Sequence, residues 1–564
     1  MKARGLLKTI RKMDPSERYC YNPKLRWNPQ VEDYFINAYG YDHFSRISKA
    51  LTRPSCYSCI RVNTLKTTSD AIIEKLCTIL QPSGSESAAD GIKNSISKCE
   101  IPGLDSVIIV KGSGPHTIDY GYASDADRPP KEVIVSRKCG EAVLRGAQVF
   151  VPGVLACSAH VEKGDLVAIS VAIEQPGVDC GWGLGITRGT VVQGSHTDPH
   201  YFERHGLYIG QGETMMSRAG IFRVSKGVAV DMNNRIFNLP SFHDVLEGEI
   251  FLQNLPSVVT AHALDPQKGE RILDMCAAPG GKTTAIAILM KDEGQLIAVD
   301  RSHNKVLDIQ NLAAEMGLKC ITTYKLDSLK AVCQMNESGR DSDITKQSSE
   351  PLSFNGVIFS PISSEKLKAE TNSKGNISNE KANERAYINK ADIGKNMQRM
   401  RNGPGRNQCV GGRVNSKGFC PNNFDRVLLD APCSALGLRP RLFVGKETVE
   451  SLRNHGKYQR RLFDHAVQLV RPGGVIVYST CTINPGENEA LVRYALDTYK
   501  FLSLAPQLPR VGGPGLVGHF EFPDGYTEEW LRPGEEEFVQ RFDPSSSLDT
   551  IGFFIAKFVV GSKE

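Results

Sequence analysis

Short apolar runs alternate with segments of helical apolar spacing along the second half of the chain, from about Arg271 onwards. The helical segments are 283–291 and 303–316. Strands that alternate with helices in this way are typical of a parallel α/β sheet. We expect the strands of this sheet at 271–275, 295–299, 321–326, 425–429 and 475–478.

A different pattern precedes this region, between residues 131 and 229. Runs of three or four apolar residues recur there at short intervals, separated by glycines and polar residues. Such spacing predicts a small all-β barrel or sandwich, with strands that include 133–135, 149–151, 166–169 and 183–186. Residues 1–130 mix basic segments with aromatic residues, and we treat them as a separate N-terminal region of α+β structure.

The apolar pattern stops between about 334 and 423. This segment is rich in Ser, Asn, Lys and Gly, and from Pro361 to Cys420 it contains 12 Lys and Arg against five Asp and Glu. A segment with so few large apolar side chains does not bury enough surface to order itself. We therefore predict a disordered basic insertion, which is either an arm that contacts phosphates or a solvated loop of no required function.

The length of 564 residues predicts two to four domains. The hydrophobic content of 40% is that of an ordinary globular protein, and the net charge of +5 permits contact with nucleic acid through local patches. No apolar run is long enough to span a membrane, and the basic N-terminus lacks the apolar core of a secretory signal. We therefore expect no membrane association.

Fifteen cysteines are spread over the whole chain. An odd number in a long chain argues against a disulfide framework and favours a reducing compartment, so we expect a cytoplasmic protein. Cys56 and Cys59 form a closely spaced pair, but no second pair follows at the spacing of a zinc site. We therefore expect no bound metal.

Two of these cysteines directly follow predicted strands. Cys433 lies in Asp430-Ala431-Pro432-Cys433-Ser434, and Cys481 lies in Ser479-Thr480-Cys481-Thr482. Because the carboxyl ends of parallel strands face one crevice, we expect both thiols in the same site, with the acid three residues before Cys433 beside them. This arrangement favours covalent chemistry, and the alternative is a pair of ordinary buried cysteines.

A glycine-rich loop joins the first strand of the expected sheet to its helix. It runs Asp274-Met275-Cys276-Ala277-Ala278-Pro279-Gly280-Gly281-Lys282-Thr283-Thr284. Glycines at this place let backbone amides approach a ligand at the helix N-terminus. Gly281-Lys282-Thr283 is similar to the end of a phosphate-binding P-loop, but that loop needs a glycine where Cys276 stands, which argues against an NTPase.

Two acids follow the next strands of the sheet. Asp300 lies 19 residues after Gly281, close to the offset at which a carboxylate holds ribose hydroxyls in nucleotide-binding folds. Asp327 follows the third strand, where it would meet an adenine amine. Each acid has an alternative role as a helix N-cap, but together they favour a cofactor that contains adenosine.

The loop and both cysteine motifs, in this order, closely resemble those of the NOL/NOP/Sun family of RNA (cytosine-5)-methyltransferases. The matching segments are 274–283, 430–434 and 479–482. The segment Gly146-Ala147-Gln148-Val149-Phe150-Val151-Pro152-Gly153 looks like part of a PUA domain, an RNA-binding barrel. A PUA domain ahead of this core resembles one branch of the family, that of the sixth Sun-domain member. The stretch 59–65 also resembles the RNA-binding segment that precedes this core.

The resemblance implies both a fold and an activity. The fold is a Rossmann-like S-adenosyl-L-methionine methyltransferase domain at 230–564, preceded by a PUA domain at 131–229 and an N-terminal RNA-binding region at 1–130. The activity is methyl transfer from S-adenosyl-L-methionine to C5 of a cytosine in RNA, with tRNA that has a free CCA end as the substrate and a monomer as the enzyme. The alternative is a catalytically silent RNA-binding protein that keeps the fold.

The resemblance also implies roles for individual residues. Cys481 is the nucleophile that adds to cytosine C6, and Cys433 assists release. We further expect Asp430 to hydrogen-bond cytosine N3 and Lys282 to hold charge near the site. Candidate RNA contacts in the PUA domain are Arg145, Lys163 and Arg188. The residues expected to hold the cofactor are Cys276, Ala277, Ala278, Pro279, Gly280, Gly281, Lys282, Asp300, Asp327 and Asp430.

Overall fold

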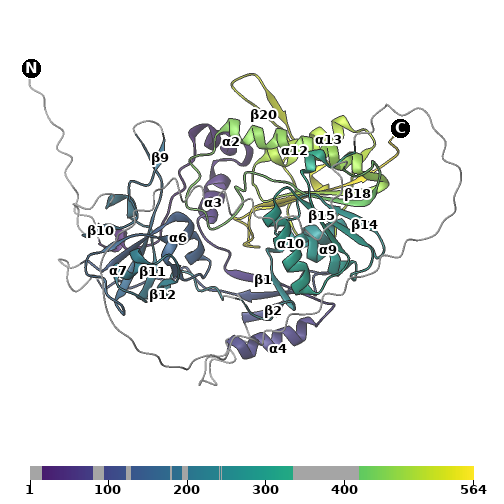
Figure 1. The fold of residues 1–564 in the computed structure, drawn as a ribbon. Helices are drawn as coiled ribbons and strands as arrows, with labels where there is room; N and C mark the ends of the chain where they lie inside the picture. Colours follow the sequence, from purple (N-terminus) through teal and green to yellow (C-terminus); the bar gives the residue numbers. More distant parts are fainter. Residues whose placement is uncertain are drawn as a thin grey trace, which may run out of the picture. The chain divides into compact units, whose positions relative to one another are not determined.

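An eight-stranded sheet lies at the centre of the C-terminal region in this computed structural model (Figure 1). The structure describes residues 15–80, 95–121, 129–177, 181–193, 201–240, 242, 244–333 and 418–563. Five strands run parallel in the order β16-β15-β14-β17-β18, and β23, β19 and β22 continue the sheet with antiparallel pairing. The strands are β14 (Arg271–Asp274), β15 (Gln295–Asp300), β16 (Ile321–Lys325), β17 (Phe424–Asp430), β18 (Val470–Thr480), β19 (Leu502–Leu504), β22 (Val539–Phe542) and β23 (Phe553–Val560).

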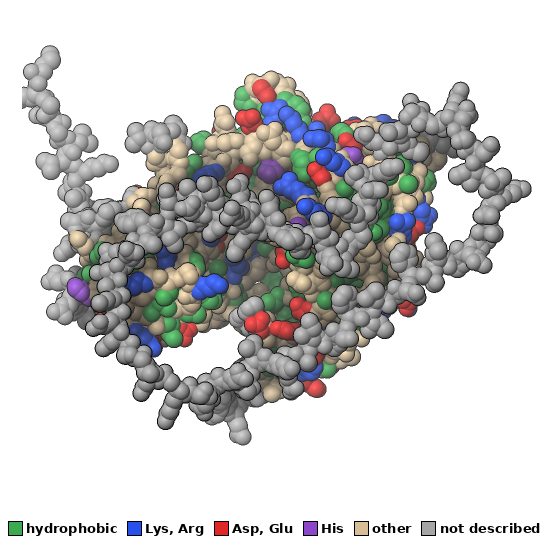
Figure 2. All heavy atoms as spheres, viewed as in Figure 1, with side chains coloured by type: hydrophobic (Ala, Val, Ile, Leu, Met, Phe, Trp, Pro, Cys, Tyr) green, Lys and Arg blue, Asp and Glu red, His purple; other side chains and the backbone are tan. Residues whose placement is uncertain are grey.

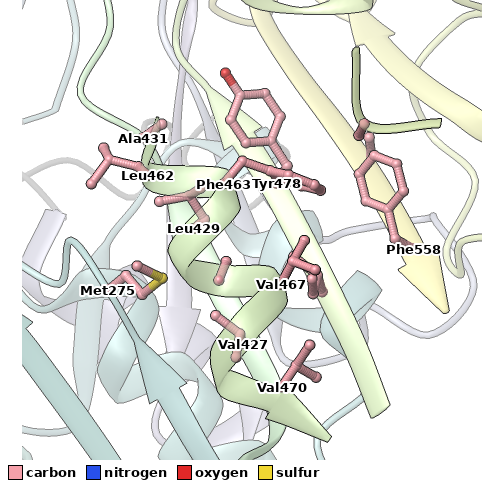
Figure 3. Close-up of a cluster of buried hydrophobic side chains, with 14 of the residues drawn as sticks. Met275, Val427, Leu429, Ala431, Leu462, Phe463, Val467, Val470, Tyr478 and Phe558 are labelled. Carbon is pink, nitrogen blue, oxygen red and sulfur yellow. The ribbon is translucent and has the colours of Figure 1, made fainter. Parts of the chain in front are cut away.

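Alternating residues of the parallel strands face two different helical layers. Leu273, Val427 and Tyr478 belong to a buried cluster with residues of α12 (Val449–Leu469) and α13 (Glu489–Thr498), part of which Figure 3 shows. Ile272, Leu428 and Val477 belong to a second cluster with residues of α8 (Leu255–Leu264) and α9 (Gly281–Leu289). Because helices cover both faces, the strands read as continuous apolar runs in the sequence.

The predicted strands and helices of this sheet are confirmed, and α10 (His303–Met316) has the predicted bounds. The antiparallel strands β19, β22 and β23 and the helix α12 carried no prediction. Helix α12 has 21 residues and is capped at its N-terminus by Thr448, whose side chain accepts a hydrogen bond from Ser451 N at 3.1 Å. Its many charged residues obscure a narrow apolar stripe, which includes Leu462, Phe463 and Val467.

A seven-stranded sheet in the order β10-β6-β4-β7-β11-β12-β5 forms the predicted β region. Its strands are β4 (Glu132–Ser136), β5 (Val149–Phe150), β6 (Val154–Ser158), β7 (Leu166–Ala172), β10 (Thr190–Val192), β11 (Tyr208–Thr214) and β12 (Val228–Arg235), with α6 (Arg137–Leu144) and α7 (Arg218–Arg223) between them. The predicted boundary at residue 229 lies inside β12, since this strand continues its pairing with β11 as far as Arg235.

One predicted strand of this region is wrong. In place of a strand at 183–186, β9 (Trp182–Gly183) pairs with β8 (Gln175–Pro176) over two residues. The strand stops there because Gly185 takes a positive φ of 65°, and Ile186 turns into a small cluster with Ile134. In addition, the expected strand at 149–151 ends at Phe150, since Val151–Gly153 form a 3₁₀ turn that contains Pro152.

The N-terminal region shares a sheet with the chain that follows the β region. Its strands β1 (Tyr57–Val62), β2 (Ile96–Lys98) and β3 (Val107–Lys111) pair with β13 (Ile250–Leu252) in the order β13-β1-β3-β2. Two helices, α2 (Pro29–Tyr39) and α3 (Tyr41–Leu51), pack their apolar faces against Leu436, Ile483 and Trp530. Residues 230–564 are therefore not structurally separate from residues 1–130.

Most of the predicted basic insertion, residues 334–417, lies outside the described residues. The chain segments on its two sides are paired, since Cys333 N donates to Phe419 O at 2.9 Å and Phe419 N donates to Ala331 O at 2.6 Å. Residues 418–423, which the sequence assigns to the insertion, therefore do not belong to it but lead directly into β17. None of the helices in the described part of the chain is long and apolar enough to cross a membrane.

Candidate active site

The two predicted thiols lie together at the carboxyl ends of two neighbouring parallel strands. Strands β17 and β18 pair in register, so that Asp430 lies opposite Ser479. The chain leaves each strand at this point, and the two following loops bring Cys433 Sγ to 3.4 Å from Cys481 Sγ. The contact between the sulfurs is part-buried. Because the two sulfurs are so close, any group that reaches one of them also lies near the other.

The two thiols differ in their ease of ionisation. A hydrogen bond joins the two thiols, and this bond, together with burial, raises the pKa of Cys433 well above its usual range. The same hydrogen bond lowers the pKa of Cys481; burial and the Asp430 carboxylate oppose this effect, and the Lys282 ammonium supports it. Cys481 is therefore the thiol that ionises first, with the proton of the pair held on Cys433.

Asp430 and Lys282 form an ion pair beside the thiols. Lys282 Nζ lies 2.8 Å from Asp430 Oδ2, and Ser479 Oγ donates to Asp430 Oδ1 at 2.7 Å. Lys282 Nζ also lies 5.2 Å from the centre of the Phe553 ring, which is buried. The side chain of Asp430 is 30% exposed, so the carboxylate remains within reach of a ligand that enters the site.

A pocket of about 210 Å³ lies between the glycine-rich loop and the start of α8. Its lining residues are Phe251, Leu252, Gln253, Asn254, Ser257, Asp274, Cys276, Ala277, Ala278, Pro279, Gly281, Lys282 and Asp430. A side chain at Gly281 would place its Cβ 2.9 Å from the Phe251 ring, so glycine leaves room there. Lys282 and Asp430, which form the ion pair beside the thiols, are both among these lining residues.

Asp274 is a buried carboxyl group in the wall of this pocket that was not among the predicted site residues. Thr283 Oγ1 donates to its Oδ2 at 2.8 Å, whereas its Oδ1 has no hydrogen-bond partner among the described residues. Burial raises the pKa of Asp274 to about 7. A buried acceptor without a partner in a pocket wall suits a ligand that carries a donor group.

Asp300 and Asp327 lie at the ends of β15 and β16, next to the loop but outside the lining of the described pocket. Asp300 Oδ1 accepts from Ser302 N at 3.0 Å, and Asp327 Oδ1 accepts from Leu329 N at 3.1 Å. Asp327 is thus an N-cap of a 3₁₀ turn, which was the alternative role. Cys276 lies close to Asp300, and its pKa is raised by burial and by nearby carboxylates including that of Asp300.

The three candidate RNA contacts of the β region have different surroundings. Arg188 uses its guanidinium internally, because it donates to Val151 O, Val154 O and Ile221 O at 2.8–3.1 Å. Arg145 is exposed, although desolvation by its surroundings lowers the pKa of its guanidinium. Lys163 is exposed as well, so Arg145 and Lys163 are the two of these residues that remain available for contact with RNA.

Sequence reasoning missed the buried polar residues behind the thiols, above all Glu487. This residue is fully buried, and it accepts hydrogen bonds from Ser434, the neighbour of Cys433, at 2.5 and 3.0 Å. A signal existed in Asn484-Pro485-Gly486-Glu487, a turn sequence that follows Cys481 and ends in an acid. The contact with Ser434 spans 53 residues and has no local signature.

Comparison with known proteins gives matches over almost the whole chain. The family model of the 16S rRNA methyltransferase RsmB/F matches residues 261–341 and 371–558, and that of the PUA domain matches residues 131–173. The chain is 66% identical to the rRNA (cytosine-C(5))-methyltransferase NOP2C of Arabidopsis thaliana, with 97% of this chain and 93% of that protein covered. It is 33% identical to the tRNA (cytosine(72)-C(5))-methyltransferase NSUN6 of Mus musculus, with 95% and 97% covered.

A solved structure is similar along the same length. The crystal structure of NSun6 from Pyrococcus horikoshii with SFG matches with a TM-score of 0.62 and 25% identity, and the match covers 95% of this chain and 99% of that chain. The β region of residues 131–173 and the sheet that carries the thiols are thus found together in one related chain.

Proposed function

Since the chain belongs to the RsmB/F family and is an S-adenosyl-L-methionine-dependent RNA (cytosine-C5)-methyltransferase, we propose that it methylates tRNA near the acceptor end through a covalent bond between Cys481 and C6 of the cytosine. The observation that carries the covalent step is the pair of thiols 3.4 Å apart, of which Cys481 ionises first. A silent RNA-binding protein would not need this pair beside a cofactor pocket.

The cofactor pocket suits S-adenosyl-L-methionine, which supplies a methyl group on a positively charged sulfur. The backbone of Cys276–Gly281 and the free acceptor Asp274 Oδ1 line the pocket, where they would hold the polar end of the cofactor. Asp300 and Asp327 stand at the ends of the next two strands, where they would hold ribose hydroxyls and the adenine amine. The NSun6 structure contains SFG, an analogue of S-adenosyl-L-methionine, which supports this assignment.

Cytosine C5 becomes a nucleophile when a thiolate adds to C6. The Cys481 thiolate forms the C6–S bond, and the electron pair of the C5–C6 double bond then becomes available at C5. Asp430 would contact cytosine N3 and stabilise the ring during addition, and Lys282 keeps the Asp430 carboxylate in place by the 2.8 Å ion pair. A base that is stacked in a helix would first have to leave its stack, unless the strand end is unpaired.

Release requires a base at C5 and a leaving group at C6. The strongest cause that raises the pKa of Cys433 is its hydrogen bond to Cys481. Once Cys481 is bonded to C6, this cause is gone, so Cys433 loses its proton to water more readily. The Cys433 thiolate then takes the C5 proton, the C5–H electron pair restores the C5–C6 double bond, and the C6–S bond breaks to return the Cys481 thiolate.

The names of the relatives support RNA but differ on its kind. NSUN6 of mouse and the Pyrococcus horikoshii relative are named for cytosine 72 of tRNA, whereas NOP2C of Arabidopsis thaliana is named for rRNA. We favour tRNA because a PUA domain precedes the catalytic sheet, as in the similar NSun6 structure. Lys and Arg side chains gather across the region where α12 lies (Figure 2). Within this helix, Lys457 and Arg461 are exposed and suited to RNA phosphates.

The test is methyl transfer from radiolabelled S-adenosyl-L-methionine to purified tRNA, to tRNA without its CCA end and to purified rRNA. We expect label in intact tRNA with the wild type, and no label with Cys481→Ala. Cys420→Ala serves as the control, because Cys420 is exposed and lies outside the site. Label that appears in rRNA and not in tRNA would overturn the substrate, and transfer by Cys481→Ala would overturn the covalent step.

A further inference from the structure

We propose that Glu487 is a positioning residue that holds Cys433 in place for the release step. This proposal rests on the proposed function, because it assigns to Glu487 the alignment of the thiol that takes the C5 proton. Glu487 lies at the end of the 3₁₀ turn Pro485–Glu487, six residues after Cys481, and its side chain is bonded to Ser434, the neighbour of Cys433.

The carboxylate of Glu487 is saturated with hydrogen bonds although it is fully buried. Oε2 accepts from Ser434 N at 3.0 Å and from Gln459 Nε2 at 2.7 Å. Oε1 accepts from Ser434 Oγ at 2.5 Å and from Asn484 Nδ2 at 2.9 Å. A carboxylate is the side chain that accepts at both oxygens and donates at neither, so it matches four donors from three elements.

These hydrogen bonds fix the loop of Cys433 to the loop of Cys481. Ser434 directly follows Cys433, and both its backbone N–H and its hydroxyl are held by Glu487. The Ser434 hydroxyl also lies 2.8 Å from Thr482 Oγ1, next to Cys481. Gln459 Nε2 contacts Pro432 O at 3.0 Å as well, so the peptide segments on both sides of Cys433 are anchored.

Electrostatics argue that Glu487 does not activate the nucleophile. Its negative charge raises the pKa of Cys433 and opposes the lowering of the pKa of Cys481. Because this buried charge disfavours both thiolates, we infer that its role is to fix the positions of the sulfurs. Their 3.4 Å separation depends on two loops that follow different strands.

The N-terminal helix α2 supports the same turn from outside the catalytic sheet. The Tyr34 hydroxyl accepts from Gly486 N at 3.0 Å and lies 2.7 Å from Glu528 Oε1, and Tyr34 is 2% exposed. Thus residues far apart in the chain meet at the turn that carries Glu487.

The test follows the covalent RNA adduct on a denaturing gel, together with S-adenosyl-L-methionine affinity by calorimetry. We expect Glu487→Gln to accumulate the Cys481–RNA adduct about tenfold over the wild type, with cofactor affinity changed by less than about twofold. Glu132→Gln is the matched control, since Glu132 is a buried, hydrogen-bonded carboxylate of the β region. Adduct accumulation in both variants, or wild-type turnover without adduct in Glu487→Gln, would overturn the proposal.

A second variant decides the question if Glu487→Gln does not fold. Ser434→Ala removes one hydroxyl that contacts Glu487 and leaves the backbone bond in place. We expect Ser434→Ala to accumulate less adduct than Glu487→Gln but more than the wild type. A Ser434→Ala variant that turns over normally and accumulates no adduct would overturn the proposal. Cys433→Ala separates a failure of this proposal from a failure of the proposed function. If Cys433→Ala gives no adduct that depends on Cys481, the covalent mechanism is wrong. If Cys433→Ala gives the adduct and Glu487→Gln does not, the covalent mechanism stands and only the positioning role of Glu487 is refuted.

Discussion

Lys282 Nζ lies 2.8 Å from Asp430 Oδ2, so the glycine-rich loop and the first cysteine motif are joined by an ion pair. These residues are 148 positions apart, and β14 and β17 bring them together because these strands are neighbours in the sheet. Both residues line the cofactor pocket and act on the Cys481 thiol: the Asp430 carboxylate raises its pKa and the Lys282 ammonium lowers it.

The charge of Lys282 is expected to control the pH dependence of methyl transfer. The ammonium lowers the pKa of Cys481, so Lys282→Met should raise that pKa and reduce the thiolate fraction at neutral pH. We expect the acidic limb of the kcat/KM profile to move to higher pH, with a larger loss at pH 6 than at pH 9. Lys282→Arg keeps the charge and serves as the control, and an equal loss at all pH values would contradict this role.

Replacement of Cys433 is expected to stop the reaction after the bond to C6 has formed. Cys433→Ala leaves Cys481 in place but removes the thiol 3.4 Å away that takes the C5 proton. Turnover should fall by about 10²–10³-fold, in line with the loss of a general base, and an RNA–protein band should appear on a denaturing gel. The double variant Cys433→Ala, Cys481→Ala should show no such band; a band there would mean that neither of these thiols forms the bond to RNA.

Asp274 is expected to make the stability of the protein depend on pH. Burial raises its pKa to about 7, from the 3.8 of an exposed acid. The folded state therefore holds the proton more tightly than the unfolded state, so this contribution to stability is complete below pH 3.8 and is lost as the pH rises through 7.

Asp274→Asn removes this titration and keeps an acceptor for Thr283 Oγ1. The Tm of the variant relative to the wild type should therefore rise between pH 5 and pH 8, as measured by thermal unfolding at both values. A difference in Tm that is the same at both pH values would show that Asp274 does not titrate in this range.

A methyl group at residue 281 is expected to weaken cofactor binding. Its Cβ would lie 2.9 Å from the Phe251 ring in the pocket wall. Overpacking of this kind costs roughly 1–3 kcal/mol, so Gly281→Ala should raise the Kd for S-adenosyl-L-methionine by about tenfold. Gly183→Ala, with nothing within 4 Å of its added Cβ, is the control, and an unchanged Kd for Gly281→Ala in calorimetry would exclude this pocket as the binding site.

The sequence predicts the catalytic sheet well because buried parallel strands are continuous apolar runs between helices. Helix 303–316 has the bounds that its spacing predicts, and both thiols lie at the strand ends that the motifs indicate. The helix α12 was not predicted because its charged surface obscures the apolar stripe. The hydrogen bonds between Tyr34 and Gly486 and between Glu487 and Ser434 join distant segments and leave no local pattern in the sequence. The prediction of a strand at 183–186 is wrong because Gly185 takes a positive φ and turns the backbone.

The packing of α2 and α3 sets an order of events during synthesis on the ribosome. Trp27, Phe35 and Phe44 find their apolar partners in residues that extend to Trp530. At 5–20 residues per second, these aromatic side chains leave the ribosome roughly half a minute to a minute and a half before the last of those partners is made. The N-terminal part of the nascent chain therefore exposes an apolar surface during synthesis. Residues from the last sixth of the chain cover this surface when they have been made.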